Sequence, residues 1–537
     1  MSVGRVQVVW FKRDLRVSDH PPLAEAALRG PVVPLYLFEP SLLRSPEWDA
    51  SHSRYIAESL SELDASLRRR GSALVTLRRE AVEALEDLWR RTRFEGLWSH
   101  EETGNDLTFR RDRAVAAWCR DRGVRWREFR QDGVVRRLRS RDGWAARWND
   151  RMSTAPVAAP SRFVSVVGIE SEGILGPEAL GLGPSGKPDA QRGGEAEARR
   201  TLETFLEVRG VDYRRAMSSP VDGWDSCSRL SPHLAWGCIS MRTVSQAADQ
   251  RLERIRWDRA AGIEVDRRWS DSLRSFQSRL RWHCHFMQKL EDEPRIEFAN
   301  FVRAYDGLRE EHTGSEEGRR RLAAWSAGRT GFPMVDACMR CVQATGWLNF
   351  RMRAMLVSVA SHLLWLHWRP TAVFLARHFL DFEPGIHFSQ FQMQSGTTGI
   401  NAVRIYSPAK QAIDQDPQGI FIRRWIPELA GVPDAYLARP ESMPEAIQAR
   451  VGCRIGRDYP EPVVEFTRAY REARERLAVI RRAAGTRVEA RRVFLRHGSR
   501  KGRGDAAVHR ELGERGLDVA SDRPDEVGSS RQLDLGL

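Results

Sequence analysis

The chain has no apolar run long enough to cross a bilayer. Its most apolar long stretch, residues 354–368, is shorter than a membrane span and contains His and Ser. The opening residues MSVGRVQVVWFKRDLR show no apolar segment before a small-residue cleavage site, so we expect no signal peptide. Seven cysteines scattered over 537 residues are too few for a disulfide framework. We therefore expect no membrane segment and a reducing compartment, the cytoplasm.

The net charge is strongly positive. Lys and Arg number 86 against 72 Asp and Glu, which gives a formal charge of +14. Such a balance favours polyanionic partners, nucleic acid above all. Nearly all of the basic residues are Arg, however, and that bias can also reflect genome composition. The 18 tryptophans suggest ring stacking or electron transfer, although a large helical core would use them equally well.

The first 135 residues alternate short β-rich segments with amphipathic helical stretches. This alternation predicts a parallel sheet covered on both faces, a Rossmann-like α/β domain whose binding sites lie at the carboxyl ends of the strands. No G-x-G-x-x-G follows the first strand, so an ordinary dinucleotide domain is excluded. The expected strands are residues 6–11, 32–38, 73–77, 96–99 and 124–129, and the expected helices are residues 22–28, 54–69, 81–91 and 106–122.

Composition divides the rest of the chain into three parts. Residues 136–198 form an interdomain connector, because Gly, Pro, Ser and Ala accumulate there without a sustained period. Residues 199–484 carry helical patterns and almost no strand signals, which predicts one large all-α domain able to bury a cofactor. Residues 485–537 are first basic and then polar, so we expect a disordered tail.

Five ordered motifs identify a resemblance. WFKRDLRVSDHPPL begins at Trp10, and CSRLSPHLAWG, WSAGRTGFPMVD, TGWLNFRMR and RIYSPAKQAIDQDPQGIFIRRWIP follow in the helical part. Together they resemble the photolyase/cryptochrome family. The resemblance implies a folded, U-shaped FAD in the helical domain and a DNA-binding cavity above it. It also implies an optional antenna chromophore, of deazaflavin or folate type, in the α/β domain.

The resemblance also assigns residues to the cofactor. Ser228 and Ser231 stand where hydroxyl groups and backbone N–H groups hold the diphosphate, with N-capping as the alternative role. Arg353 and Asp381 match the Arg–Asp pair beside the flavin ring, and His387 matches the position facing flavin N5, commonly Asn, unless it is a structural histidine. The full expected FAD set is Tyr213, Cys227, Ser228, Arg229, Leu230, Ser231, His283, Arg353, Asp381, Phe382, Glu383 and His387.

The expected lesion pocket departs from the family pattern. Trp282 matches a Trp that stacks on flipped bases, and it joins Arg353, Asp381 and His387 as the expected catalytic group. Arg279 replaces the family's pocket Glu, and His283 stands where Arg is usual. The expected DNA-binding residues are Arg279, Trp282, Phe350, Arg351 and Met393.

Two further features differ from the common family pattern. The electron-transfer triad keeps its middle Trp at Trp368, but Phe391 and Ser315 replace its proximal and distal members. Ordinary photoreduction should therefore fail, and Trp365, Trp347 or Tyr406 remain open as substitutes or as core residues. The C-x-x-C of Cys338 and Cys341 lacks a convincing fourth ligand for an iron–sulfur cluster, so we expect core cysteines and no metal.

Two peripheral sites are expected. Lys12, Arg13, Asp14 and Arg16 after the first strand could border an antenna pocket, together with Glu101, Glu102 and Asn105 after the fourth, or could simply form a salt-bridged strand end. The last six residues, from Gln532 to Leu537 (QLDLGL), resemble the hexapeptide by which bacterial repair proteins bind the DNA sliding clamp. An ordinary solvated tail is the alternative.

These expectations converge on one function. The chain resembles a blue-light-driven, FAD-dependent deoxyribodipyrimidine photo-lyase, a carbon–carbon lyase that repairs cyclobutane pyrimidine dimers in UV-damaged DNA by electron transfer from reduced flavin. We expect a monomer that associates with the nucleoid when bound to DNA. Two alternatives stay open at this stage: a (6-4) photolyase, favoured by the histidines, and a cryptochrome-like photoreceptor without repair activity, favoured by the altered lesion pocket.

Overall fold

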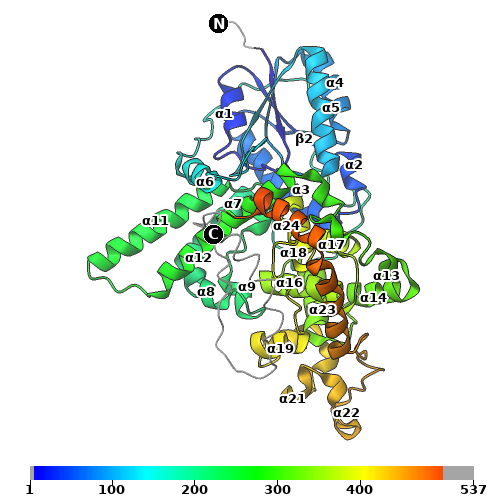
Figure 1. Cartoon of the computed structure of the whole chain (residues 1–537). Helices are drawn as coiled ribbons and strands as arrows, with labels where there is room; N and C mark the ends of the chain where they lie inside the picture. The colour runs from blue at the N-terminus through cyan, green and yellow to red at the C-terminus, as the bar shows by residue number, and fades with distance from the viewer. Residues whose placement is uncertain (1–4, 500–537) are drawn as a thin grey trace.

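The computed structural model describes residues 5–499, which form an α/β domain, a long connector and a helical domain (Figure 1). The α/β domain contains one five-stranded parallel sheet in the order β3-β2-β1-β4-β5. The predicted sheet is confirmed. Its strands are β1 (Gln7–Phe11), β2 (Val32–Leu37), β3 (Val75–Leu77), β4 (Gly96–His100) and β5 (Arg125–Phe129).

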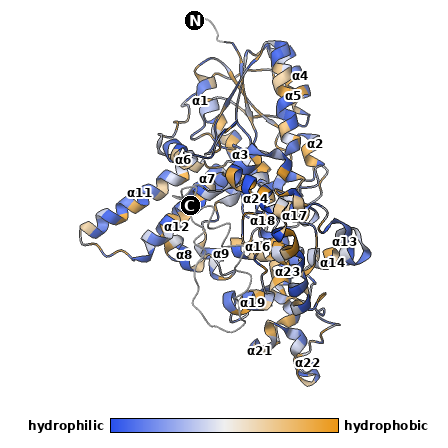
Figure 2. Cartoon of the chain, viewed as in Figure 1, coloured by the Kyte–Doolittle hydropathy of each residue, from blue (hydrophilic) through white to orange (hydrophobic). Residues whose placement is uncertain are grey.

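Strand β1 shows why the sheet is covered on both faces. All five of its residues are buried, because successive side chains point to opposite faces and each face carries helices. Val9 and Phe11 pack with α1 (Pro21–Ala27) and α3 (Ala50–Arg68). Val8 and Trp10 pack on the other side with α4 (Ala81–Thr92) and α5 (Asp106–Arg122). In Figure 2 these helices show hydrophilic residues alternating with hydrophobic ones, as amphipathic covering helices should.

The connector contains more structure than its composition predicts. Helix α6 (Trp144–Ser153) lies within residues 136–198, and α7 (Glu195–Glu207) begins before residue 199. Trp144, Trp148 and Met152 are buried, and this apolar stripe fixes α6 against the helical domain. The rest of the connector runs back along the sheet, where the Val32 N–H donates to the Val164 carbonyl at 2.9 Å.

The helical domain is built around a second apolar core that includes Trp325, Trp368 and Phe388. Helices α11 (Met241–Ala260) and α12 (Arg268–Asp292) project from it as an antiparallel pair, visible at the left of Figure 1. A short α2 (Pro40–Leu43) completes the α/β domain. The helices of the helical domain after α7 are α8 (Tyr213–Ala216), α9 (Asp222–Ser226), α10 (Ser231–Ala235), α11 (Met241–Ala260), α12 (Arg268–Asp292), α13 (Glu310–Gly314), α14 (Glu316–Ser326), α15 (Pro333–Thr345), α16 (Phe350–Ser358), α17 (Trp368–His378), α18 (Pro384–Gln394), α19 (Pro408–Gln415), α20 (Ile420–Trp425), α21 (Asp434–Leu437), α22 (Glu445–Val451), α23 (Phe466–Arg482) and α24 (Ala484–His497).

Helix α24 corrects the expected disordered tail. The prediction that disorder begins at residue 485 is wrong up to His497, because Ala490 and Val493 are buried in a small apolar cluster. His497 is also buried and lies 2.7 Å from a carboxylate oxygen of Glu293. Basic composition suggested a solvated segment, but one apolar stripe and the hydrogen bond of His497 to Glu293 are enough to hold this helix. The candidate clamp-binding residues lie outside the described part of the chain.

The cysteines lie in the protein core. All seven cysteines are buried and unpaired. Cys338 and Cys341 lie inside α15, where the Cys341 thiol contacts the Thr345 hydroxyl at 3.8 Å. Across residues 5–499 we find no helix whose length and apolar content would let it span a membrane.

The two domains are joined by a buried ion pair. Asp19 of the α/β domain accepts two bonds from the guanidinium of Arg242 on α11, one at 3.1 Å, and a third at 2.6 Å from the Ser240 hydroxyl. The Val157 N–H of the connector also donates to Asp19, at 2.9 Å. Burial alone would raise the pKa of Asp19, but these donors lower it to about 2. One carboxylate therefore ties all three parts of the chain together.

We predict that Asp19→Asn weakens this junction. The Asn keeps the left-handed backbone at this position (φ 49°) but turns an amide N–H toward the buried guanidinium of Arg242. The free energy of unfolding should fall by about 3 kcal/mol. Urea unfolding, monitored by tryptophan fluorescence, measures this free energy. Glu25→Gln, which alters an exposed ion pair with Arg29, should cost under about 1 kcal/mol. Equal losses in the two variants would contradict the role given to Asp19.

Candidate functional site

A cavity of about 340 Å³ opens between the helices of the helical domain. Its walls come from α8, α12, α16 and α18 and from the segments that precede α10, α16 and α18. The lining is mostly apolar with a few charged groups, which is the usual make-up of a cofactor pocket.

Most of the residues expected at the cofactor and the lesion line this one cavity. Positions far apart in the sequence meet here because α12 and α18 pack against each other. The expected residues that line it are Tyr213, Cys227, Ser228, Arg229, Ser231, Arg279, Trp282, His283, Phe350, Arg351, Arg353, Asp381, Glu383 and His387.

Three expected contact residues are not among the residues that line the cavity. Leu230 is 1% exposed and packs into the core shared with the α/β domain. Phe382 packs into the core of the helical domain, and its carbonyl accepts a bond from Arg13 at 2.9 Å. Met393 is partly buried on α18, beside the lining residues Gln390 and Gln394. Trp368, the expected electron carrier, is wholly buried and also lies outside the lining.

An ion pair between Arg353 and Asp381 crosses the cavity wall. The guanidinium donates to both carboxylate oxygens, at 2.9 and 2.8 Å, and its Nε donates to the Leu348 carbonyl at 2.8 Å. Burial alone would raise the pKa of Asp381, but Arg353 holds it below its usual value. A fixed cation beside a fixed carboxylate suits a ring that carries both donors and acceptors.

His387 is held in one orientation and is uncharged at neutral pH. Its Nε2 lies 2.8 Å from the Ala372 carbonyl, so Nε2 carries the proton and Nδ1 is left as an acceptor. Burial lowers the pKa of His387 to about 4. The ring lies 4.5 Å from that of Phe391. This histidine can therefore accept a hydrogen bond from a ligand without adding charge to the cavity.

His283 and Glu383 form a second ion pair at the edge of the cavity. His283 Nε2 lies 2.8 Å from a carboxylate oxygen of Glu383. Burial lowers the pKa of His283, but the Glu383 carboxylate outweighs it and holds that pKa well above its usual value. Both residues also border a smaller space between the domains, next to Asp132. The pair therefore separates the cavity from the domain interface.

Part of the lining was not expected from the sequence. Ile386, Gln390 and Gln394 were not expected, although with His387 and Phe391 they follow the three- and four-residue spacing of one helix face. That spacing could have found them. Trp347 was noted only as a possible electron carrier, and it lines the cavity.

The polar groups of the wall are incompletely paired, which tests whether a polar cofactor fits. Buried polar atoms without a partner cost free energy unless a ligand satisfies them. Six such atoms belong to lining residues: Arg229 Nη1, Trp282 Nε1, His283 Nδ1, Asn349 Oδ1, Arg351 Nε and Gln390 Oε1. Donors and acceptors are both present, so the wall fits a large ligand with mixed polarity.

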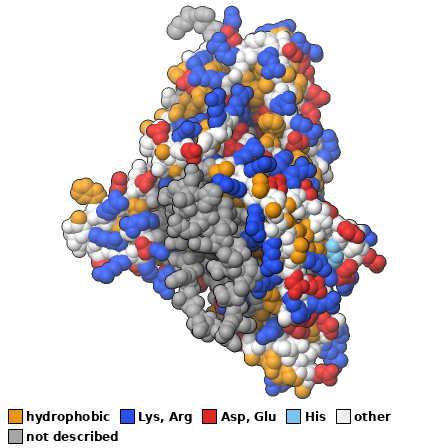
Figure 3. All heavy atoms as spheres, in the orientation of Figure 1, with side chains coloured by type: hydrophobic (Ala, Val, Ile, Leu, Met, Phe, Trp, Pro, Cys, Tyr) orange, Lys and Arg blue, Asp and Glu red, His pale blue; other side chains and the backbone are white. Residues whose placement is uncertain are grey.

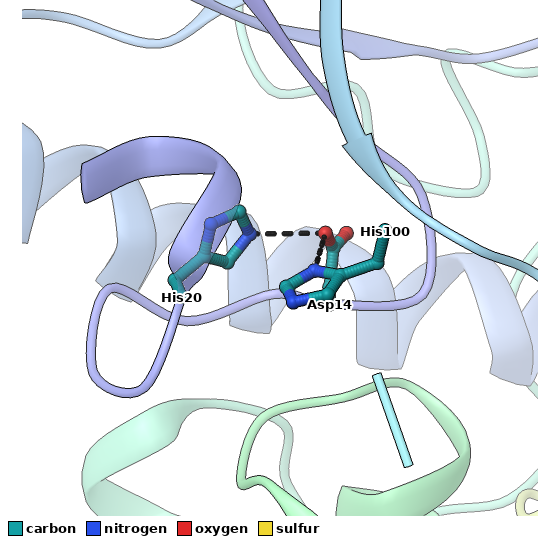
Figure 4. A group of neighbouring side chains, drawn as sticks. All are labelled: Asp14, His20 and His100. Atoms are coloured by element: carbon teal, nitrogen blue, oxygen red, sulfur yellow. Dashed lines mark hydrogen bonds and ion pairs between the residues drawn. The ribbon is translucent and has the colours of Figure 1, made fainter. Parts of the chain in front are cut away.

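One cluster outside the cavity has the composition of a metal site. Asp14, His20 and His100 are buried and lie together (Figure 4). Asp14 Oδ2 lies 2.9 Å from His20 Nε2 and 2.7 Å from His100 Nδ1. The Leu23 N–H donates to His20 Nδ1 at 3.1 Å, which places the His20 proton on Nε2. That nitrogen is a donor to Asp14. The three residues therefore form a hydrogen-bonded network that links the loop after β1, the end of β4 and the start of α1.

Comparisons with known proteins agree with this geometry. Residues 7–143 match a family model described as DNA photolyase, and residues 276–479 match one described as the FAD binding domain of DNA photolyase. A cryptochrome DASH of Natronomonas pharaonis is 27% identical over 485 residues, 86% of this chain and 98% of that protein. A deoxyribodipyrimidine photo-lyase of Streptomyces griseus is 28% identical over 502 residues, 86% of this chain and 97% of that protein. A solved class III photolyase from Agrobacterium tumefaciens superposes with a TM-score of 0.78 at 26% identity, covering 90% of this chain and 99% of that one.

The His283–Glu383 pair predicts a pH effect. Because the pKa of His283 is raised in the folded state, its contribution to stability is complete below about pH 6.5 and disappears as the pH rises through the folded-state pKa. His283→Arg keeps its charge at alkaline pH. Between pH 7 and pH 10 the melting temperature of the parent chain should therefore fall relative to that of His283→Arg. Thermal unfolding of both proteins followed by fluorescence measures the difference, and parallel curves would contradict it.

Proposed function

The chain belongs to the photolyase/cryptochrome family, and from that premise we propose that it is a blue-light-driven DNA photolyase that repairs cyclobutane pyrimidine dimers. Its helical domain is the family's FAD-binding domain. The observation that carries the proposal is the single cavity in which the paired Arg353 and Asp381, the acceptor His387 and the base-stacking candidate Trp282 come together. We propose FAD as the ligand of its inner part and a flipped dimer as the ligand of its mouth.

Each side chain has a distinct part in this proposal. FAD, when bound in its reduced form, supplies a light-driven electron that splits the dimer and then returns, so no net redox change results. Arg353 opposes excess negative charge at the flavin, and Asp381 fixes the arginine and the flavin donors. His387 offers Nδ1 as an acceptor. Trp282 presents an indole face to the lesion, and the Arg279 guanidinium lies 5.9 Å from that ring, where a cation would stabilise developing negative charge.

The surface supports a nucleic-acid partner. Figure 3 shows basic side chains over both domains on the displayed face, interspersed with acidic ones, and the chain carries a net charge of +14. Phe350 at the cavity is 41% exposed, which suits contact with an unstacked base. Phosphate contacts from arginines such as Arg351 would make DNA affinity fall with salt. We propose that the protein acts as a monomer in the cytoplasm.

A photoreceptor is the second candidate. Arg279 in place of an acidic residue at the lesion, together with similarity to cryptochromes, favours it. A (6-4) photolyase is the third, because His283 and His387 lie at the cavity. All three candidates bind FAD. They differ in which DNA lesion they repair, and the photoreceptor repairs none.

An antenna chromophore is proposed in the α/β domain. A small cavity of about 50 Å³ lies at the carboxyl edge of the sheet, bordered by rings of Trp10, Tyr36, Trp48 and Trp236. Arg111 crosses it in ion pairs with Glu39 at 2.8 Å and Glu102 at 2.6 Å. Aromatic walls with a paired arginine suit the chemistry of a flat conjugated pigment, but the cavity is smaller than the roughly 300–1,000 Å³ of ligand pockets, so the walls would have to move apart to admit one.

A repair assay tests the proposed function. The reduced, FAD-loaded protein is illuminated with blue light beside oligonucleotides that carry either a cyclobutane dimer or a (6-4) product, and restored thymine is quantified. We expect restoration of the dimer substrate only, and loss of at least about tenfold in rate for Trp282→Ala because one base-stacking contact is removed. Restoration of the (6-4) substrate alone would establish that subclass. No restoration of either lesion would favour the photoreceptor.

Sliding-clamp binding by the last six residues, from Gln532 to Leu537, is proposed separately. Removing these residues should abolish binding of the full chain to an immobilised bacterial clamp, because the three leucines are the proposed apolar anchors. Repair of short oligonucleotides should be unchanged. Surface plasmon resonance measures the binding, and a full chain with a scrambled hexapeptide is the matched control. Equal binding of the intact chain and the truncated chain would refute the proposal.

A further inference from the structure

The usual tryptophan route to the flavin is interrupted in this chain. Phe391 lies in the cavity wall, where a proximal Trp would be expected. Trp368 is wholly buried, and its ring contacts are Phe388 at 6.4 Å and His367 at 5.4 Å. Its Nε1 donates to Asn300 at 2.8 Å. Phenylalanine is much harder to oxidise than indole, so Phe391 does not relay an electron from Trp368 to the cavity.

A different pair of indoles connects the cavity to the protein surface. Trp347 lines the cavity and is 6% exposed. Its ring meets that of Trp224 edge-to-face, with centroids 5.5 Å apart and planes at 82°. Trp224 lies in the middle of α9 and is only partly buried, and it packs against both large apolar cores. One ring thus borders the ligand and its neighbour reaches solvent.

Arg229 sits against both rings. Its guanidinium carbon lies 4.1 Å from each ring centroid, and its Nε donates to Gln191 at 3.2 Å. Burial lowers the pKa of Arg229 to about 10, so it remains a cation at neutral pH. A cation makes an adjacent indole harder to oxidise. Because the two distances are equal, both rings are affected alike, and a positive hole is trapped on neither.

The other candidate aromatics lack such a connection. Trp365 is 6% exposed and lies between Arg309 and Arg476, at 4.7 and 4.8 Å, without an aromatic neighbour among the described residues. Tyr406 lines the cavity, but no ring within residues 5–499 continues from it to the surface. Among these candidates, only Trp347 both lines the cavity and touches a second indole.

We infer that Trp347 and Trp224 form the electron path by which a flavin in the cavity is photoreduced, an inference that rests on the proposed FAD function. One electron passes from the Trp347 indole to the photoexcited oxidised flavin. Trp224 then returns one electron to Trp347, and a dissolved thiol returns one electron to Trp224. The flavin gains one electron, and the thiol loses one electron and releases its proton to water, which leaves a thiyl radical. Two such radicals combine into one disulfide for every two electrons delivered. No bond of either indole forms or breaks.

Steady illumination of the purified, FAD-loaded protein with excess dithiothreitol tests the path. Loss of the oxidised-flavin absorbance gives the photoreduction rate. Trp224→Phe should slow it by at least about tenfold, because phenylalanine cannot supply the second electron. Trp368→Phe and Trp257→Phe, the latter at a 77% exposed position, should stay within about twofold of the parent. Equal rates in the parent and Trp224→Phe would overturn the inference, as would a slow Trp368→Phe.

Two measurements separate this inference from the proposed function. Bound flavin per protein and the unfolding midpoint should be unchanged in Trp224→Phe, and a variant that fails either measurement is replaced by Trp224→Leu. Chemical reduction with dithionite bypasses the path, so Trp224→Phe reduced in this way should repair dimers at the parent rate. A parent chain that binds no flavin refutes the proposed function. A parent that binds and photoreduces flavin independently of Trp224 refutes only the electron path.

Discussion

The cavity depends on the ion pair between Arg353 and Asp381. Arg353 belongs to α16 and Asp381 to the segment that leads into α18, so their two hydrogen bonds join two walls of the cavity. The Leu380 N–H, which donates to the Gly346 carbonyl at 3.0 Å, links the same two segments. A buried charge without its partner is strongly destabilising, which means that each side chain fixes the other. The guanidinium also lies 4.1 Å from the Phe379 ring. The same pair that keeps the cavity open therefore provides its most sharply oriented charges.

The second constraint is the packing of the α/β domain on the helical domain. The loop after β1 contributes Arg16, whose guanidinium donates to the Gly237 carbonyl at 2.9 Å, and Asp19, which receives Arg242. These contacts position α11, and α11 packs along α12. Helix α12 carries Arg279, Trp282 and His283 into the cavity. A motif at the N-terminus of the chain thus acts on the site indirectly, by placing the helix that carries these three lining residues.

The departures from the family pattern are concentrated on the proposed lesion side of the cavity and along the proposed electron path. Arg279, His283 and Phe350 differ from the family pattern, whereas Arg353 and Asp381, proposed to contact the flavin, match it; all five line the cavity. This division explains why FAD binding follows from family membership while the lesion does not. Arg229 belongs to both regions. It lines the cavity, and from a backbone in the left-handed region (φ 60°) its side chain lies against Trp224 and Trp347.

The amino-acid sequence by itself determined the parallel sheet, the helical domain and the family. Strands such as Gln7–Phe11 and motifs such as TGWLNFRMR are local signals. Their hydrophobic period and spacing can be recognised in the sequence without knowing the fold. It also named half of the residues that line the cavity, through positions matched to the family. Only the tertiary structure decided that Leu230, Phe382 and Met393 lie outside the wall, that α24 is ordered, and that Trp224 touches Trp347. Each of these depends on contacts between segments distant in sequence, and no local pattern encodes which side of a helix another helix will cover.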